Sequence, residues 1–193
     1  MTGFTTRCCR SASCLAALAV LVLGAAWTAP ARADGIEVRK AALISAENGY
    51  VLEADFEVTL THTLEEALNK GVPLHFILEF ELTRPRWYWF NQKIADTRQQ
   101  YRLSYNALTR QYRVGLRFLY QNFATLAEAL EFMSRVRVPA VADSATFSKG
   151  ASYLAALRLR LDASQLPRAF QVSAVGSRDW SISSDWHRWT VSP

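Results

Sequence analysis

Strict two-residue alternation is the feature that most constrains how this chain can fold. From Leu52 to Leu60, apolar side chains occupy every second position, and Glu, Asp or Thr stand between them. Residues 74–83 and 153–161 alternate in the same way. Because successive side chains of a β-strand point to opposite faces, each segment predicts a strand with one buried and one solvated face. Strands of this kind are typical of antiparallel sheets.

Turn and capping signals complete the expected architecture. Asn48-Gly49 lies between two apolar stretches and indicates a hairpin. Two segments with the spacing of a capping box, residues 63–66 and 125–128, predict short helices, and Gly71 should end the first one. Further strands are expected over residues 36–44, 86–90, 101–105, 109–120, 170–174 and 185–191, with a looser region at 139–150.

These elements predict a mainly β fold. We expect an antiparallel β-sandwich, immunoglobulin-like, of about eight strands with two short inserted helices. A partly closed barrel is the alternative. No repeat, low-complexity tract or long linker divides the chain after its first 33 residues.

The first 33 residues have the layout of a secretory signal peptide. Arg7 and Arg10 precede an uncharged run over residues 15–26, and Ala31-Arg32-Ala33 forms an A-x-A cleavage site. The apolar run is shorter than the roughly 20 residues that a membrane-spanning helix needs. We therefore expect a cleaved signal peptide over 1–33 and a single domain over 34–193. Export by the general secretion pathway would place that domain in the periplasm, and retention as an anchor is the alternative.

Cysteine usage and charge exclude two further classes. All three cysteines lie within the first 14 residues, so the mature chain cannot form disulfides. Residues 34–193 carry 19 basic and 17 acidic side chains, which gives no case for nucleic-acid binding. The charge is uneven, with a net of −7 over residues 34–83 and +7 over 84–120. We expect neighbouring strands with complementary outer faces, and the alternative is a dipolar surface that docks a charged partner.

Motifs for catalysis are scarce in this sequence. There is no G-x-S-x-G elbow, and the three histidines, His62, His75 and His187, lack metal-ligand spacing. We therefore predict no catalytic residue, no metal site and no cofactor. Carboxylates are the exception, because two suffice for glycosidase chemistry. A five-carboxylate patch would form if two predicted strands paired, and its members are Glu53, Asp55, Glu57, Glu79 and Glu81. The alternative is ordinary surface charge neutralised by Arg and Lys.

An aromatic block flanked by arginines is the most unusual local feature. Residues 84–90 read RPRWYWF, and alternation should turn one aromatic pair toward the core and the other outward. Aromatic and arginine side chains dominate protein-binding hot spots. The candidate binding surface therefore contains Arg84, Arg86, Trp87, Trp89 and Trp186. The structural alternative is that these aromatics cover a sheet face.

Several segments together resemble a family of exported proteobacterial proteins known as domain of unknown function 4390. They are RWYWF at 86–90, RLSY at 102–105, ALTRQYR at 107–113, SRVR at 134–137, LDASQLP at 161–167, RDW at 178–180 and SDW at 184–186. The resemblance implies an uncharacterised exported protein and transfers no catalytic residue. By the family's usual gene neighbourhood, it also implies an envelope partner, a membrane sensor histidine kinase of the nitrogen-regulation type.

These observations favour a non-enzymatic periplasmic interaction or sensory-accessory module. A periplasmic small-molecule binding protein with an apolar pocket between the sheets is the first alternative. The second is an envelope hydrolase that uses Glu53, Glu79 or Glu81.

Overall fold

Two antiparallel sheets form the fold in the computed structural model, which describes residues 35–47, 49–86, 88, 91–143, 146–148, 150–174 and 177–192. The three-stranded sheet has the order β1-β2-β7, and the six-stranded sheet has the order β6-β5-β4-β3-β8-β9. The strands are β1 (Gly35–Ala46), β2 (Gly49–Thr59), β3 (Leu74–Arg84), β4 (Gln92–Asn106), β5 (Gln111–Leu116), β6 (Leu119–Phe123), β7 (Arg135–Ala142), β8 (Tyr153–Leu161) and β9 (His187–Val191). The expected signal peptide lies outside the described residues.

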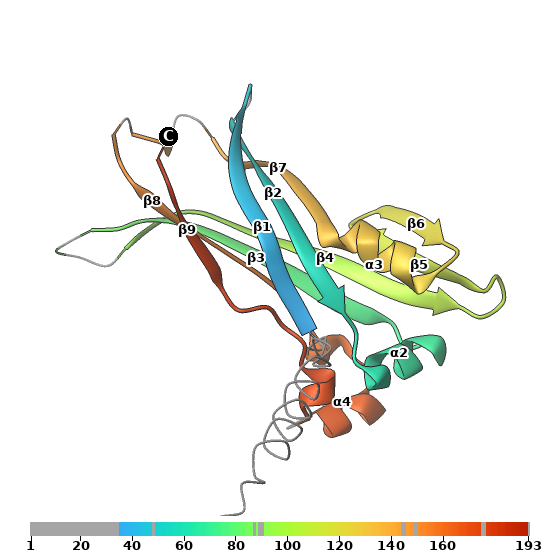
Figure 1. The fold of residues 1–193 in the computed structure, drawn as a ribbon. Coiled ribbons are helices and arrows are strands. Elements are labelled where there is room, and N and C mark those ends of the chain that lie inside the picture. The colour runs from blue at the N-terminus through green and yellow to red at the C-terminus, as the bar shows by residue number, and fades with distance from the viewer. Residues whose placement is uncertain are drawn as a thin grey trace, which may run out of the picture. The chain divides into compact units, whose positions relative to one another are not determined.

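The mainly β, antiparallel prediction is confirmed. Figure 1 shows β1 and β2 crossing the longer β3–β4 hairpin, and β1 contacts β8 and β9 of the other sheet. An immunoglobulin sandwich pairs sheets of four and three strands through Greek-key connections. Here β3, β4, β5 and β6 instead follow one another as a meander within one sheet, so the strand order does not bear out the immunoglobulin-like detail.

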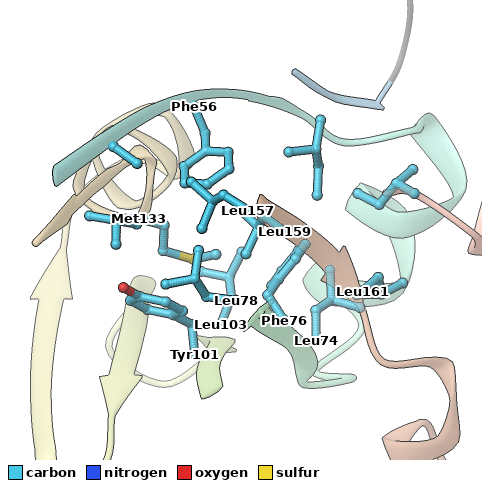
Figure 2. Packing of buried hydrophobic residues seen from close by; sticks show 14 of the residues in the cluster. Phe56, Leu74, Phe76, Leu78, Tyr101, Leu103, Met133, Leu157, Leu159 and Leu161 are labelled. Atoms are coloured by element: carbon cyan, nitrogen blue, oxygen red, sulfur yellow. The ribbon is translucent and has the colours of Figure 1, made fainter. Parts of the chain in front are cut away.

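Alternation explains the core. The apolar positions predicted to point inward from β2, β3 and β8 are buried, except for the half-buried Val58, and the intervening residues are more exposed. Figure 2 shows the side chains from both sheets meeting in one cluster, to which α3 (Leu126–Ser134) adds Met133. Fully buried members include Leu52, Phe76, Leu78, Phe80, Leu103, Tyr153 and Leu157.

Both predicted helices form, with one shift at the start of the first. Thr125 caps α3 by accepting a hydrogen bond from the Glu128 backbone N–H at 3.2 Å, as its capping box predicts. The first helix, α2 (His62–Asn69), is capped by Thr61 and not by Thr63, because the Thr61 side chain accepts the Leu64 N–H at 3.3 Å.

Three local predictions are wrong. The segment expected to be loose, 139–150, begins inside an edge strand, β7, which extends through Pro139 to Ala142. The strand expected over 170–174 is part of a helix, α4 (Arg168–Ala174). The strand expected over 109–120 is two strands, β5 and β6, joined by a turn at Arg117-Phe118.

Candidate functional site

The predicted aromatic strand is the connection of the β3–β4 hairpin. Arg84 and Gln92 form the last residue pair of the hairpin. The described residues between them, Pro85, Arg86, Tyr88 and Asn91, are not part of a strand. Pro85 lacks the N–H that would continue the ladder. Arg86 is exposed and donates a hydrogen bond to the Gln92 side chain. Trp87 and Trp89 lie outside the described residues.

Trp186 lies elsewhere, on the outer face of the six-stranded sheet. Its ring lies 4.5 Å from the guanidinium carbon of Arg158, a cation–π contact. Arg158 pairs across strands with Glu79, five residues along β3 from Arg84, or about 17 Å at the rise of a strand. The structure therefore does not bring Trp186 together with the two predicted arginines.

Glu79 is the centre of an ion-pair cluster on the same outer face. Its carboxylate accepts hydrogen bonds from Arg158 Nε at 3.0 Å and from Arg160 Nη2 at 3.3 Å, and Arg98 Nε lies 3.9 Å away. Burial by itself would raise the pKa of Glu79, but the hydrogen bonds from the two β8 arginines outweigh it and hold the pKa below its ordinary value. Glu79 is therefore an anion that fixes arginines in place.

The predicted five-carboxylate patch does not form. Three of its members lie on β2, which belongs to the three-stranded sheet, whereas Glu79 and Glu81 lie on β3 of the other sheet. On β2, Glu53 lies 3.5 Å from Arg137 of β7, and Glu57 pairs with Arg39 of β1. Glu53 and Glu57 thus form ion pairs within the three-stranded sheet, and Glu79 and Glu81 form theirs within the six-stranded sheet.

A row of four residues across four strands forms a groove that the sequence did not predict. His75 of β3 pairs with Arg102 of β4, Arg102 with Gly115 of β5, and Gly115 with Tyr120 of β6. A Cβ at Gly115 would lie 2.8 Å from Cε1 of Tyr120, so the ring needs a glycine beneath it. The basic groove, as we call it, is lined by His75, Arg98, Gln100, Arg102, Gly115, Arg117 and Tyr120.

The groove has a surplus of positive charge. Arg98 approaches Glu79, but neither Arg102 nor Arg117 forms an ion pair with any carboxylate in the described part of the chain. Burial and then the charge of Arg102 lower the pKa of His75, and the Gln100 amide nitrogen lies 3.4 Å from His75 Nδ1. His75 is therefore neutral near pH 7, and the two unpaired guanidiniums give the groove the chemistry of an anion site.

An exposed apolar turn borders the groove. Leu116 pairs with Leu119, so Arg117 and Phe118 form the two-residue turn between β5 and β6. Phe118 is 95% exposed, Leu119 76% and Tyr120 62%. Arg117 has a φ of 53°, in the left-handed region that non-glycine residues rarely adopt. This turn could not be predicted from the sequence, because Arg117-Phe118 contains no Gly, Asn, Asp or Pro.

In the part of the chain that the structure describes, no three His, Cys, Asp or Glu side chains are grouped so that they could hold a metal ion. None of the described helices is long and apolar enough to cross a membrane.

Comparisons with known proteins give one match. A family model for a domain of unknown function, DUF4390, matches residues 33–190. No curated protein and no solved structure matches the chain.

Proposed function

We propose that this chain, which belongs to the DUF4390 family, is a non-enzymatic interaction module of the bacterial periplasm. In this proposal the basic groove binds an anionic partner in the envelope. One observation carries it: Arg102 and Arg117 lie on a solvated sheet face without a carboxylate partner among the described residues. The signal-peptide pattern of residues 1–33 supports the compartment and export by the general secretion pathway.

The position of these arginines favours binding over a structural role. Like charges on one sheet face destabilise the fold unless they are neutralised. Glu79 forms ion pairs with Arg158 and Arg160 and approaches Arg98, but it forms none with Arg102 or Arg117. A guanidinium presents a planar fork of donors that matches carboxylate and phosphate oxygens. An anionic partner would therefore supply the missing countercharge.

The two alternatives have less support. A binder with a pocket between the sheets needs space there, but large side chains such as Phe56, Phe76 and Met133 occupy the described interior (Figure 2). A hydrolase needs a carboxyl group whose pKa is raised, and the pKa of Glu79 is shifted in the opposite direction. The family's association with a sensor histidine kinase makes an envelope protein one candidate partner.

Cross-linking in the native envelope tests this function. The wild type is compared with the double variant Arg102→Gln/Arg117→Gln and with Arg110→Gln/Arg168→Gln, which loses the same charge from exposed positions outside the groove. We expect the groove variant to lose its cross-linked envelope component while the control retains it. Thermal unfolding of all three proteins checks that they are equally folded. Unchanged cross-linking by a folded groove variant would refute the proposal.

A further inference from the structure

The geometry points to a membrane surface as the anionic partner of the basic groove. We infer that Phe118 and Leu119 insert into a bilayer of anionic phospholipid, while Arg102 and Arg117 bind lipid phosphates. This inference rests on the function proposed above and names the partner of that same site.

Two exposed apolar side chains at the β5–β6 turn are suited to insertion into a bilayer. Phe118 is 95% exposed and Leu119 is 76% exposed, although large apolar side chains are normally buried. Phe118 lies in the two-residue turn, and Leu119 is the first residue of β6, paired with Leu116 on the sheet face opposite to Tyr120. Exposed apolar side chains fit a bilayer without shape complementarity, whereas a protein partner would need a matching pocket. Bilayer insertion is therefore the simplest way to bury both side chains.

Cations surround this turn on the groove side. Arg117 directly precedes Phe118, and Arg102 lies across β5 from Tyr120, through Gly115. Tyr120 is 62% exposed and carries a polar hydroxyl on an apolar ring, the combination enriched at membrane interfaces. Basic side chains beside inserted apolar ones bind anionic lipids by adding electrostatic attraction to hydrophobic transfer.

The backbone of Arg117 adds an independent observation. Its φ of 53° is a conformation that favours glycine, so arginine at this position costs backbone strain. A purely structural turn would gain from a glycine there. Arg110 has a similar φ of 52° in the β4–β5 turn, so the conformation is not specific to the groove, but at Arg117 it places a cation beside Phe118.

Leu108 provides a matched control for the apolar turn. It is 97% exposed in the turn between β4 and β5, at the opposite end of β5. Phe118→Ser and Leu108→Ser each remove one exposed apolar side chain from a hairpin turn. Only the first change removes a side chain next to the basic groove.

Vesicle sedimentation tests the inference with the protein exported and processed by its host. Vesicles of mixed phosphatidylglycerol and phosphatidylcholine are compared with pure phosphatidylcholine vesicles at low and high salt. We expect binding to the mixed vesicles that weakens with salt. Phe118→Ser should lower the partition coefficient about tenfold, as expected from losing one buried apolar side chain. Arg102→Gln/Arg117→Gln should lower it at least as much and flatten the salt dependence, while Leu108→Ser and Arg110→Gln/Arg168→Gln should stay within about twofold of the wild type.

The outcomes separate this inference from the proposed function. If mixed vesicles do not bind but groove-dependent cross-linking to an envelope protein is found, the membrane inference is overturned and the proposed function stands. Competition by soluble glycerol phosphate without vesicle binding would likewise overturn the membrane inference in favour of a free anion. Equal binding by Phe118→Ser and the wild type would overturn insertion. If vesicle binding and groove-dependent cross-linking both fail, the two proposals fall together.

Discussion

Replacing Glu79 by glutamine should destabilise the fold in a way that depends on pH. The Glu79 side chain is 8% exposed and accepts hydrogen bonds from Arg158 and Arg160. Burial opposes its charge, but those two hydrogen bonds keep the pKa below the ordinary value of 4.5. Glutamine keeps the size of the side chain and one acceptor, and it removes the charge that compensates the two arginines.

The expected cost follows from the exposure of the partners. A hydrogen bond to a charged group contributes about 1.5–3 kcal/mol, and breaking a fully buried ion pair costs about 3–5 kcal/mol. Arg158 and Arg160 have side-chain exposures of 29% and 33%, so water partly solvates them after the change. We therefore expect Glu79→Gln to lower the free energy of unfolding by about 2 kcal/mol near pH 7.

The lowered pKa of Glu79 determines how its contribution to the free energy of unfolding changes with pH. A carboxyl group whose pKa is lower in the folded state stabilises the fold above its unfolded pKa, and this contribution is lost as the pH falls through the folded pKa. The difference between wild type and Glu79→Gln should therefore be full above about pH 4.5 and shrink below it. Urea unfolding at several pH values measures it. Glu81→Gln is the matched control, because Glu81 is 42% exposed and lies 3.7 Å from Lys93. A cost below about 0.5 kcal/mol, or one that persists unchanged in acid, would refute the reasoning.

Two further predictions concern local structure. Gly49→Ala should destabilise the fold by more than about 2 kcal/mol, because Gly49 has a φ of 122° and a Cβ there would lie 2.5 Å from the Ala142 carbonyl oxygen. Gly71→Ala, at a φ of 88° with no atom within 4 Å of the added Cβ, should cost only about 1 kcal/mol, and equal unfolding free energies for the two variants would contradict the clash. Thr125→Ala should cost about 1 kcal/mol by removing the N-cap of α3, and the same stability in urea as the wild type would argue against that cap.

Much of the strand content could be predicted because it depends on local alternation. β2, β3 and β8 each have one buried and one solvated face, so their apolar residues recur at the strand period. Strands whose alternation is interrupted were harder to predict. β7 alternates as well, with Val136 and Val138 buried between exposed arginines, but Pro139 obscured it. Proline is tolerated there because β7 is an edge strand.

The wrong predictions at α4 and at the β5–β6 turn have a different cause. Residues 170–174 read FQVSA and alternate over only five positions, and periodicity cannot distinguish a strand from a helix over so short a segment. The β5–β6 turn carries Arg117 at a positive φ, where a glycine would have marked the turn in the sequence. Here arginine occupies a backbone conformation that glycine adopts more readily.

The basic groove could not be predicted, because it depends on which strands pair. His75, Arg102, Gly115 and Tyr120 form one row only through three successive strand registers. Their spacing along the chain corresponds to no motif. Register is specified by the buried face of a sheet, whereas these side chains lie on the other face.

Sheet assignment also explains why the groove keeps its charge. The acidic segment 34–83 and the basic segment 84–120 were expected to neutralise each other as neighbouring strands, and β3 does pair with β4. However, Glu53, Asp55 and Glu57 are on β2, in the other sheet, where Arg137, Lys40 and Arg39 lie opposite or beside them. The surplus of arginine on the outer face is therefore a direct consequence of the topology, because most of the acidic strand residues expected to balance β4 and β5 belong to the other sheet.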